Sequence, residues 1–357
     1  MKKSLLVLIT LCGCVAASFF TACDGRNIAK IDTANDSNIA SLVEPQPENT
    51  PELIVLSLGT ATPTPIPSII PTQIPVPILT PVPTPFAIVW LADTQAISYH
   101  ENTHVFDAMG RWIVEQKKNA NVLYVVQTGD MVDNGFKLEQ WDAFDVCYNQ
   151  FKNELPYFAI AGNHDIGVKL QDYSAYLARP NVSSIPRRNS FERGRAVYAT
   201  FEAGGAKFLL LGAGWGSEEM SVSWMNQILR YHSDYIAILL FHSYIHDDGS
   251  YTNVGKKMYE QVVLPNENVR LVLCGHLRGT GVRFEDIDDN GDGVPNRKVT
   301  AMLYNYQNYS NNCGQIRLLN FDPVTRSIHV STYSPYTEKY YDDSYFHSAE
   351  FDLENAF

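Results

Sequence analysis

The sequence predicts an α/β fold in which two β-sheets pack together and helices cover their outer faces. Short apolar runs, typical of buried strands, alternate with segments of helical periodicity between residues 86 and 263. Further short strands and turns continue to about Tyr333, which supplies enough strands for a second sheet. The chain has 357 residues, of which 45% are apolar, so it can bury a sizeable core in one large domain or two ordinary ones.

The first part of this region reads as strand, helix, strand, helix, strand. Phe86–Ala92, Val122–Val126 and Tyr157–Ala161 are apolar enough to be buried strands. Apolar residues recur at helical spacing from Val105 to Ile113, and a second helix is predicted from Leu138 to Phe151. This alternation predicts right-handed βαβ units and a mainly parallel sheet.

The second part contains more elements of both kinds. A turn at Gly204-Gly205 separates two strands around Phe201 and Phe208–Leu211. The remaining predictions are short or regular helices at Gln171–Ala178, Val222–Tyr231 and Val254–Val263, strands at Ile236–Phe241 and Val269–Cys274, and a loop at residues 181–194.

Polar residues follow five of the predicted strands, at the point where each strand ends. The segments are Asp93-Thr94-Gln95, Gly129-Asp130, Gly162-Asn163-His164-Asp165, Phe241-His242 and Gly275-His276. In open α/β sheets, ligands bind at the carboxyl ends of the strands, so we expect these side chains to converge. Carboxylate, amide and imidazole donors together suit divalent metal ions of hard to borderline character.

Taken in order, the five segments resemble the calcineurin-like metallophosphoesterase superfamily, whose pattern is D-x-H, G-D, G-N-H-D/E, a lone His and G-H-x-H. The resemblance runs from about Phe86 into the C-terminal region and implies a four-layer α-β-β-α sandwich. Five ordered motifs, each after a predicted strand, are far more specific than any one of them. The chain departs from the pattern twice, because Gln95 and Arg278 stand where the family has His.

The resemblance implies a centre for one or two divalent metal ions: Mn, Fe or Zn, with Mg as a further option. Asp130 resembles the carboxylate that bridges the two ions. Asp93 and Gln95 would serve the first ion, and Asn163, His242 and His276 would complete the second site. A neutral amide is a weaker donor than imidazole, and Arg278 stays protonated, so the first site favours Mn²⁺ or Mg²⁺, weak loading, or no ion at all.

The same resemblance suggests catalytic roles for three further residues. His164 resembles the family residue that protonates the leaving oxygen, and we expect Asp165 to orient it. Arg278 has two readings: its guanidinium clamps a phosphate of the substrate, or it points away to a surface carboxylate.

An acidic segment, Asp288–Gly293, carries oxygens at alternate positions as calcium loops do. Val299 stands where such a loop needs Glu, and the flanking runs predict a hairpin. Two interpretations remain: a plain acidic turn, or a Ca²⁺ site at Asp288–Asp292.

The first 85 residues predict export and anchoring. Residues 1–23 resemble a bacterial lipoprotein signal, with basic Lys2-Lys3, an apolar core and small residues before Cys23, which would carry lipid. An ordinary cleaved signal peptide is the alternative. Twelve of the nineteen prolines lie between Pro45 and Pro85, so residues 24–85 predict an extended linker that holds a catalytic domain, residues 86–357, at the cell surface.

Few cysteines remain for structural roles after removal of the signal. Cys147, Cys274 and Cys313 do not form a disulfide framework, and the first two are expected to be buried apolar residues.

The predicted function is a surface-anchored hydrolase of phosphate mono- or diesters, in which metal-activated water attacks phosphorus and His164 acts as the acid. The formal charge of −12 argues against binding to a nucleic-acid duplex, and we expect a monomer. Two alternatives remain: a degenerate relative that binds a phosphorylated ligand or surface polymer without turnover, and an adhesion or scaffold protein.

Overall fold

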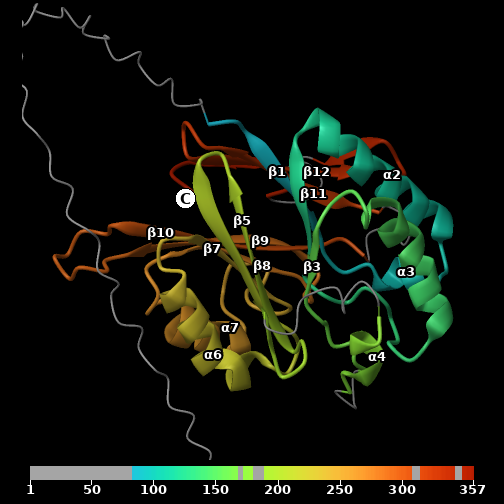
Figure 1. The fold of residues 1–357 in the computed structure, drawn as a ribbon, viewed down its shortest axis with the longest axis horizontal. Helices are drawn as coiled ribbons and strands as arrows, with labels where there is room; N and C mark the ends of the chain where they lie inside the picture. The colour runs from blue at the N-terminus through green and yellow to red at the C-terminus, as the bar shows by residue number, and fades with distance from the viewer. Residues whose placement is uncertain (1–82, 168–171, 180–188, 308–313, 342–347) are drawn as a thin grey trace, which may run out of the picture. The chain divides into compact units, whose positions relative to one another are not determined.

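The computed structural model describes residues 83–167, 172–179, 189–307, 314–341 and 348–357, as Figure 1 shows. All of them fall within one compact unit, Val76–Phe357. The predicted signal, nearly all of the predicted linker, most of the loop at 181–194 and Cys313 lie outside the described residues. No helix in the described ranges is long and apolar enough to cross a membrane.

The first sheet is parallel at one end and antiparallel at the other. Its order is β13-β12-β11-β1-β2-β3, and β14 also pairs with β12. The pairs β1–β2 and β2–β3 are parallel, whereas β1–β11 and the pairs beyond it are antiparallel. Its strands are β1 (Phe86–Leu91), β2 (Val122–Gln127), β3 (Tyr157–Ala159), β11 (Ile316–Asp322), β12 (Ser327–Ser334), β13 (Lys339–Tyr341) and β14 (Phe351–Leu353).

The second sheet has the order β4-β5-β6-β7-β8-β10-β9. Its centre, from β6 to β10, is parallel, and antiparallel pairs flank it on both sides. Its strands are β4 (Ser190–Phe191), β5 (Ala196–Ala203), β6 (Ala206–Ala213), β7 (Ile236–Phe241), β8 (Val269–Cys274), β9 (Gly279–Ile287) and β10 (Arg297–Asn305). Both sheets are therefore mixed. The strands β1, β2 and β3 are parallel, as the βαβ pattern predicted, but antiparallel pairs outnumber parallel ones in the first sheet, so the expectation of a mainly parallel sheet is wrong there.

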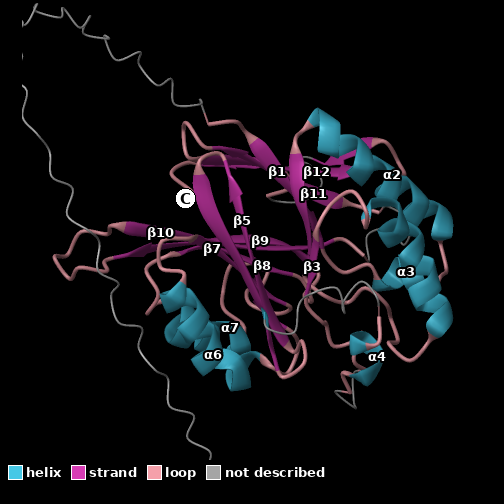
Figure 2. Cartoon of the chain, viewed as in Figure 1, coloured by secondary structure: helices cyan, strands magenta, loops and turns pink. Residues whose placement is uncertain are grey.

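The helices lie on the outer faces of the two sheets. In Figure 2, α2 and α3 lie on one side of the molecule and α6 and α7 on the other. The helices are α1 (Gln95–Tyr99), α2 (Thr103–Asn119), α3 (Leu138–Phe151), α4 (Ser174–Leu177), α6 (Glu218–Tyr231) and α7 (Asn253–Met258), and α7 continues as a π-helical turn, Tyr259–Val263.

Three apolar cores separate the four layers. The central core lies between the sheets, where Phe86 of β1 stacks on Phe321 at a centroid distance of 4.7 Å and meets the edge of Phe208 from the other sheet. A second core joins the first sheet to α2 and α3, and a third joins the second sheet to α6 and α7. The α-β-β-α sandwich expected from the sequence is confirmed.

Several boundaries differ from the sequence-based ones. The helix predicted from Val222 begins at Glu218, because the acidic residues 218 and 219 form its first turn. The helix predicted at 171–178 is described only as Ser174–Leu177. Cys147 and Cys274 are free and buried, as expected.

The topology brings the predicted site together. Because β1, β2 and β3 run parallel, the residues that follow them meet at one edge of the first sheet. The same holds for the residues that follow β7 and β8 in the second sheet. These two edges face each other across the sandwich, so the site draws side chains from both sheets.

Candidate metal centre

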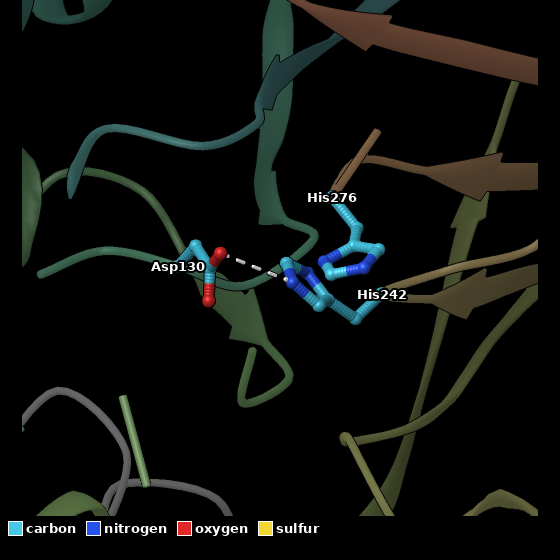
Figure 3. Close-up of side chains that lie close together, drawn as sticks. All are labelled: Asp130, His242 and His276. Atoms are coloured by element: carbon cyan, nitrogen blue, oxygen red, sulfur yellow. Dashed lines mark ion pairs between the residues drawn. The ribbon is translucent and has the colours of Figure 1, made fainter. Parts of the chain in front are cut away.

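Asp130, His242 and His276 form a cluster at this meeting point, which Figure 3 shows. Each offers one ligand atom, and these atoms lie within 4.8 Å of one another. Asp130 follows β2 of the first sheet, whereas the two histidines follow β7 and β8 of the second. A carboxylate and two imidazoles at this separation are a donor set that suits a divalent transition metal.

The His242 ring is held by a hydrogen bond from its own Nδ1. This atom donates to the carbonyl oxygen of Thr128 at 2.8 Å. As a result, Nε2 faces the site, 3.2 Å from Asp130 Oδ2 and 3.1 Å from Asn163 Oδ1. Fixing the outer nitrogen in this way sets the tautomer and directs the inner lone pair toward a metal. The structure therefore places Asn163 in the set, as the sequence predicted.

Asp93 lies beside His276 at the other side of the cluster. Both of its carboxylate oxygens accept from the backbone N–H of His276, at 3.0 and 3.1 Å. This contact depends on Gly275, because a Cβ at that position would lie 2.1 Å from Asp93 Oδ1. The Gly-His pair after β8 is thus needed so that the backbone can approach the carboxylate.

Two of the metal-binding candidates have left-handed backbones. Asp130 has φ 51° and His276 has φ 66°, a conformation that is uncommon for residues other than Gly, although Asn, Asp and His adopt it more often than the rest. Residues held in such conformations cluster at functional sites. Gly162 leaves room for the Asp130 carboxylate, because a Cβ at that position would lie 2.1 Å from Asp130 Oδ1.

Gln95 lies within the site, as predicted. Its Nε2 donates to Asp130 Oδ2 at 3.0 Å, and its Oε1 is buried without a hydrogen-bond partner among the described residues. A buried amide oxygen with no donor is costly unless something else satisfies it. A cation beside Asp93 and Asp130 would do so, and the residues present therefore fit a metal at the first site as well as at the second.

The ionisable groups of the site also favour bound cations. Burial raises the pKa of Asp93 well above its usual range, and burial together with Asp130 raises the pKa of Asp165 to about 7. Burial and the neighbouring His242 lower the pKa of His276 to about 4, so its imidazole is neutral and can act as a ligand.

For His242, burial alone would lower the pKa, but the carboxylates of Asp130 and Asp93 outweigh burial and raise this pKa to about 10. The site thus holds more buried carboxyl groups than cationic side chains. Divalent cations would neutralise them.

The expected role of Asp165 is wrong. Its carboxylate does not contact the His164 ring; it accepts the backbone N–H groups of Met131 at 2.8 Å, Val132 at 3.2 Å and Gly162 at 2.8 Å. Because these amides belong to both loops, the fully buried carboxylate ties the loop after β2 to the loop after β3.

His164 is oriented by Asp133 instead. Its Nδ1 donates to the carbonyl oxygen of Asp133 at 2.7 Å and lies 3.4 Å from the same residue's carboxylate. The backbone N–H of His164 donates to Asp130 Oδ1 at 2.9 Å, so the ring stands next to the metal-binding residues. Asp133 lies outside the matched motifs, so the sequence analysis did not identify it.

The two remaining sequence candidates have different outcomes. Arg278 is exposed, in the turn between β8 and β9, and forms no ion pair with a described carboxylate; neither of its two readings is tested. In the acidic loop, Asp288 accepts backbone N–H groups of Gly291 and Gly293, and Asp289 pairs with Arg297 at 2.6 Å. These oxygens already have partners within the hairpin, which favours the plain acidic turn.

Trp215 and Glu218 were missed. The Trp215 ring contacts both histidines, with centroid distances of 4.7 Å to His276 and 5.7 Å to His242. Glu218 is only 4% exposed, and its carboxyl lies in the electrostatic range of His242. The available signal was the Gly214-Trp215-Gly216 run after the apolar strand Phe208–Leu211, which is a sixth strand end.

Comparison with known proteins agrees with this geometry. The model of a family described as calcineurin-like phosphoesterase matches residues 86–277, a range that contains all five segments. Among solved structures, the purple acid phosphatase PPD1 of yellow lupin (Lupinus luteus) is similar with a TM-score of 0.51 and 13% identity, covering 76% of this chain and 54% of that one. The similarity supports the fold.

Two curated proteins are similar in sequence. The uncharacterized protein YvnB of Bacillus subtilis (strain 168) is 37% identical over 279 residues, which is 75% of this chain but only 21% of YvnB. This chain thus spans about a fifth of that relative's length. A protein of Moraxella catarrhalis (strain BBH18) with the name "Probable cyclic nucleotide phosphodiesterase" is 28% identical, over 54% of this chain and 71% of its own length.

Proposed function

This chain belongs to the calcineurin-like phosphoesterase family, and on that premise we propose that it is a metal-dependent hydrolase of phosphate esters. We further propose that it works at the bacterial cell surface, anchored through a lipidated Cys23 and the linker of residues 24–85. The support for the location is the sequence of the first 85 residues alone.

The convergence of Asp130, His242 and His276 carries the proposal for activity. Asn163 contacts His242, and Asp93 contacts the His276 backbone. The Oε1 of Gln95 has no hydrogen-bond partner among the described residues, so six side chains can share one or two cations. In this family the ions supply an acidified water and neutralise charge on the phosphoryl oxygens.

The protein's own side chains would position the substrate and move a proton. His164 is partly exposed, next to Asp130, with Nδ1 occupied by the Asp133 carbonyl. Its Nε2 is therefore the atom available to protonate the leaving oxygen, and the Asp133 carboxylate at 3.4 Å stabilises the charged ring that must do so. Asp165 keeps the two loops in register.

The substrate is a monoester or a diester. The name of the Moraxella relative supports a diester, although it belongs to a protein that is 28% identical. A non-catalytic phosphate binder is the second candidate, favoured by Gln95 and Arg278 standing where the family has His. The geometry at His164 favours the enzyme, since a binder needs no proton donor.

The experiment compares His164→Ala with the parent on two esters after loading with Mn²⁺. For an alkyl phosphate, whose leaving alkoxide needs a proton, kcat/KM should fall by about 10² to 10³. For p-nitrophenyl phosphate, whose leaving group is stable as an anion, the loss should be much smaller.

The control is His329→Ala, because His329 lies on β12 and pairs with Asp352 outside the metal centre. This variant should match the parent on both esters. Equal losses for both esters in His164→Ala would remove the acid role. A parent that binds metal and turns over no ester would favour the second candidate.

A further inference from the structure

We propose that a pocket beside the metal centre selects the alcohol part of the substrate, and that it favours an alcohol carrying a positive charge, such as choline or ethanolamine. This inference rests on the proposed phosphoesterase activity. It concerns residues that no family motif contains.

The pocket has a volume of about 260 Å³ and opens at the start of α6. Its walls are formed by Trp215, Gly216, Glu218, Glu219 and Val254. This volume accommodates a small organic group, and it lies just below the usual range of about 300–1,000 Å³ for ligand pockets.

Trp215 is the wall that the pocket shares with the metal centre. Its ring lies 4.7 Å from that of His276 and 5.7 Å from that of His242. Two hydrogen bonds fix the backbone of Trp215. Its backbone N–H donates to the Ala161 carbonyl at 2.9 Å, and its carbonyl oxygen accepts from the Tyr173 hydroxyl at 2.7 Å. A phosphate at the metals therefore has its alcohol within reach of the indole.

Glu218 gives the pocket its charge. Glu218 is one of the residues that line the pocket, and it is only 4% exposed. No Lys, Arg or His within the described ranges forms an ion pair with it, and the groups that favour its charged form are backbone amides and the more distant His242. Burial raises the pKa of Glu218 to about 7, so a cation bound beside this carboxyl would stabilise its charged form.

Glu219 does not have the same function. It is exposed and pairs with Lys257 at 2.6 Å, so its charge is already balanced. It also supplies a negative charge in the first turn of α6, a position where carboxylates stabilise a helix. Glu218 also accepts from backbone amides at the start of α6, but no cationic side chain among the described residues balances its charge.

An indole ring and a carboxylate without a cationic partner among the described residues, in one pocket, are a site for an ammonium group. The ring attracts a cation through its quadrupole, and the attraction grows when the cation is desolvated. The carboxylate supplies the opposite charge. A neutral alcohol would gain only apolar contact with Trp215 and Val254, and an alcohol bearing a second phosphate would be repelled by Glu218.

The test uses phosphocholine and 3,3-dimethylbutyl phosphate, which have the same shape and differ by one charge. The parent should hydrolyse phosphocholine with a kcat/KM about tenfold higher or more. In Glu218→Gln this ratio should fall close to one. The ratio is insensitive to the fraction of protein that folds. Glu260→Gln, an exposed residue paired with Lys256 outside the pocket, should keep the parent ratio.

Binding provides a readout that does not depend on turnover. Choline should bind the metal-loaded parent more tightly than 3,3-dimethylbutan-1-ol by calorimetry, and Glu218→Gln should abolish the difference. Equal affinity and equal kcat/KM for the charged and neutral compounds in the parent would overturn the inference. A parent that hydrolyses p-nitrophenyl phosphate but does not prefer phosphocholine over 3,3-dimethylbutyl phosphate would also overturn it. If no ester is hydrolysed, the proposed function fails, and the choline binding still decides the inference.

Discussion

Replacing Gly162 with Ala should damage the metal centre without changing any metal-binding side chain. Gly162 has a negative φ, so Ala is sterically permitted by its own backbone. The added Cβ would, however, lie 2.1 Å from Asp130 Oδ1 and 2.3 Å from the Asp130 backbone N. Real Cβ contacts do not fall below 3.0 Å, so one of the two loops must move by about 1 Å.

That displacement sets the expected magnitude. The moving atoms include the Asp130 carboxylate, whose Oδ2 is 3.2 Å from His242 Nε2, and a shift of about 1 Å is large relative to this distance. Errors of this size cost on the order of 10²-fold in a positioned site. We expect the affinity for Mn²⁺ to fall by about 10²-fold, and the free energy of unfolding by about 1–3 kcal/mol from overpacking.

Calorimetric titration with Mn²⁺ and urea unfolding measure the two effects separately. Gly293→Ala is the matched control, because Gly293 has φ 86° and open space around it at the hairpin tip. This control should lose about 1 kcal/mol of stability and keep its Mn²⁺ affinity. An Mn²⁺ affinity of Gly162→Ala within threefold of the parent would refute the reasoning about the two loops.

Two further predictions concern single groups. Gln95→His, which restores the family's imidazole beside Asp130, should raise the metal content per chain and the affinity for Zn²⁺, measured by mass spectrometry and titration; unchanged content would remove Gln95 from the metal site. Glu218 has a pKa of about 7 against an ordinary 4.5, so its contribution to stability is present below pH 4.5 and is lost as pH rises to 7. Relative to the parent, Glu218→Gln should therefore gain about 3 kcal/mol in urea unfolding between pH 4.5 and 8, and an equal difference at both pH values would contradict the burial argument.

The sequence predicted those parts of the site that are contiguous motifs at the ends of strands. A strand followed by Gly-Asp or Gly-Asn-His-Asp is a contiguous signal, and parallel pairing then forces the ends to converge. The four layers followed from the resemblance to the family, and the turn at Gly204-Gly205 predicted the two strands that pair as β5 and β6. The role of Gly162 and Gly275, which leave room for neighbouring carboxylates, became clear only from the structure.

The sequence did not predict which side chain contacts which. Asp165 follows His164 directly, yet neighbours in a turn point in different directions, and Asp165 turns inward to three backbone amides while Asp133 holds the imidazole. Most of these hydrogen bonds join residues 31 to 34 positions apart and leave no periodic pattern in the sequence. Trp215 and Glu218 were missed for the same reason, because their importance comes from contact with the second sheet's histidines.

The most direct test of the metal centre is Asp130→Asn, measured for metal content and phosphate-ester hydrolysis beside Asp234→Asn. Asp130 is 1% exposed and contacts both His242 and Gln95, whereas Asp234 is an exposed residue that pairs with Lys207. We expect the metal content of Asp130→Asn to fall close to zero and hydrolysis to be lost, with both retained in Asp234→Asn. Unchanged metal content in Asp130→Asn would contradict the assignment of the site.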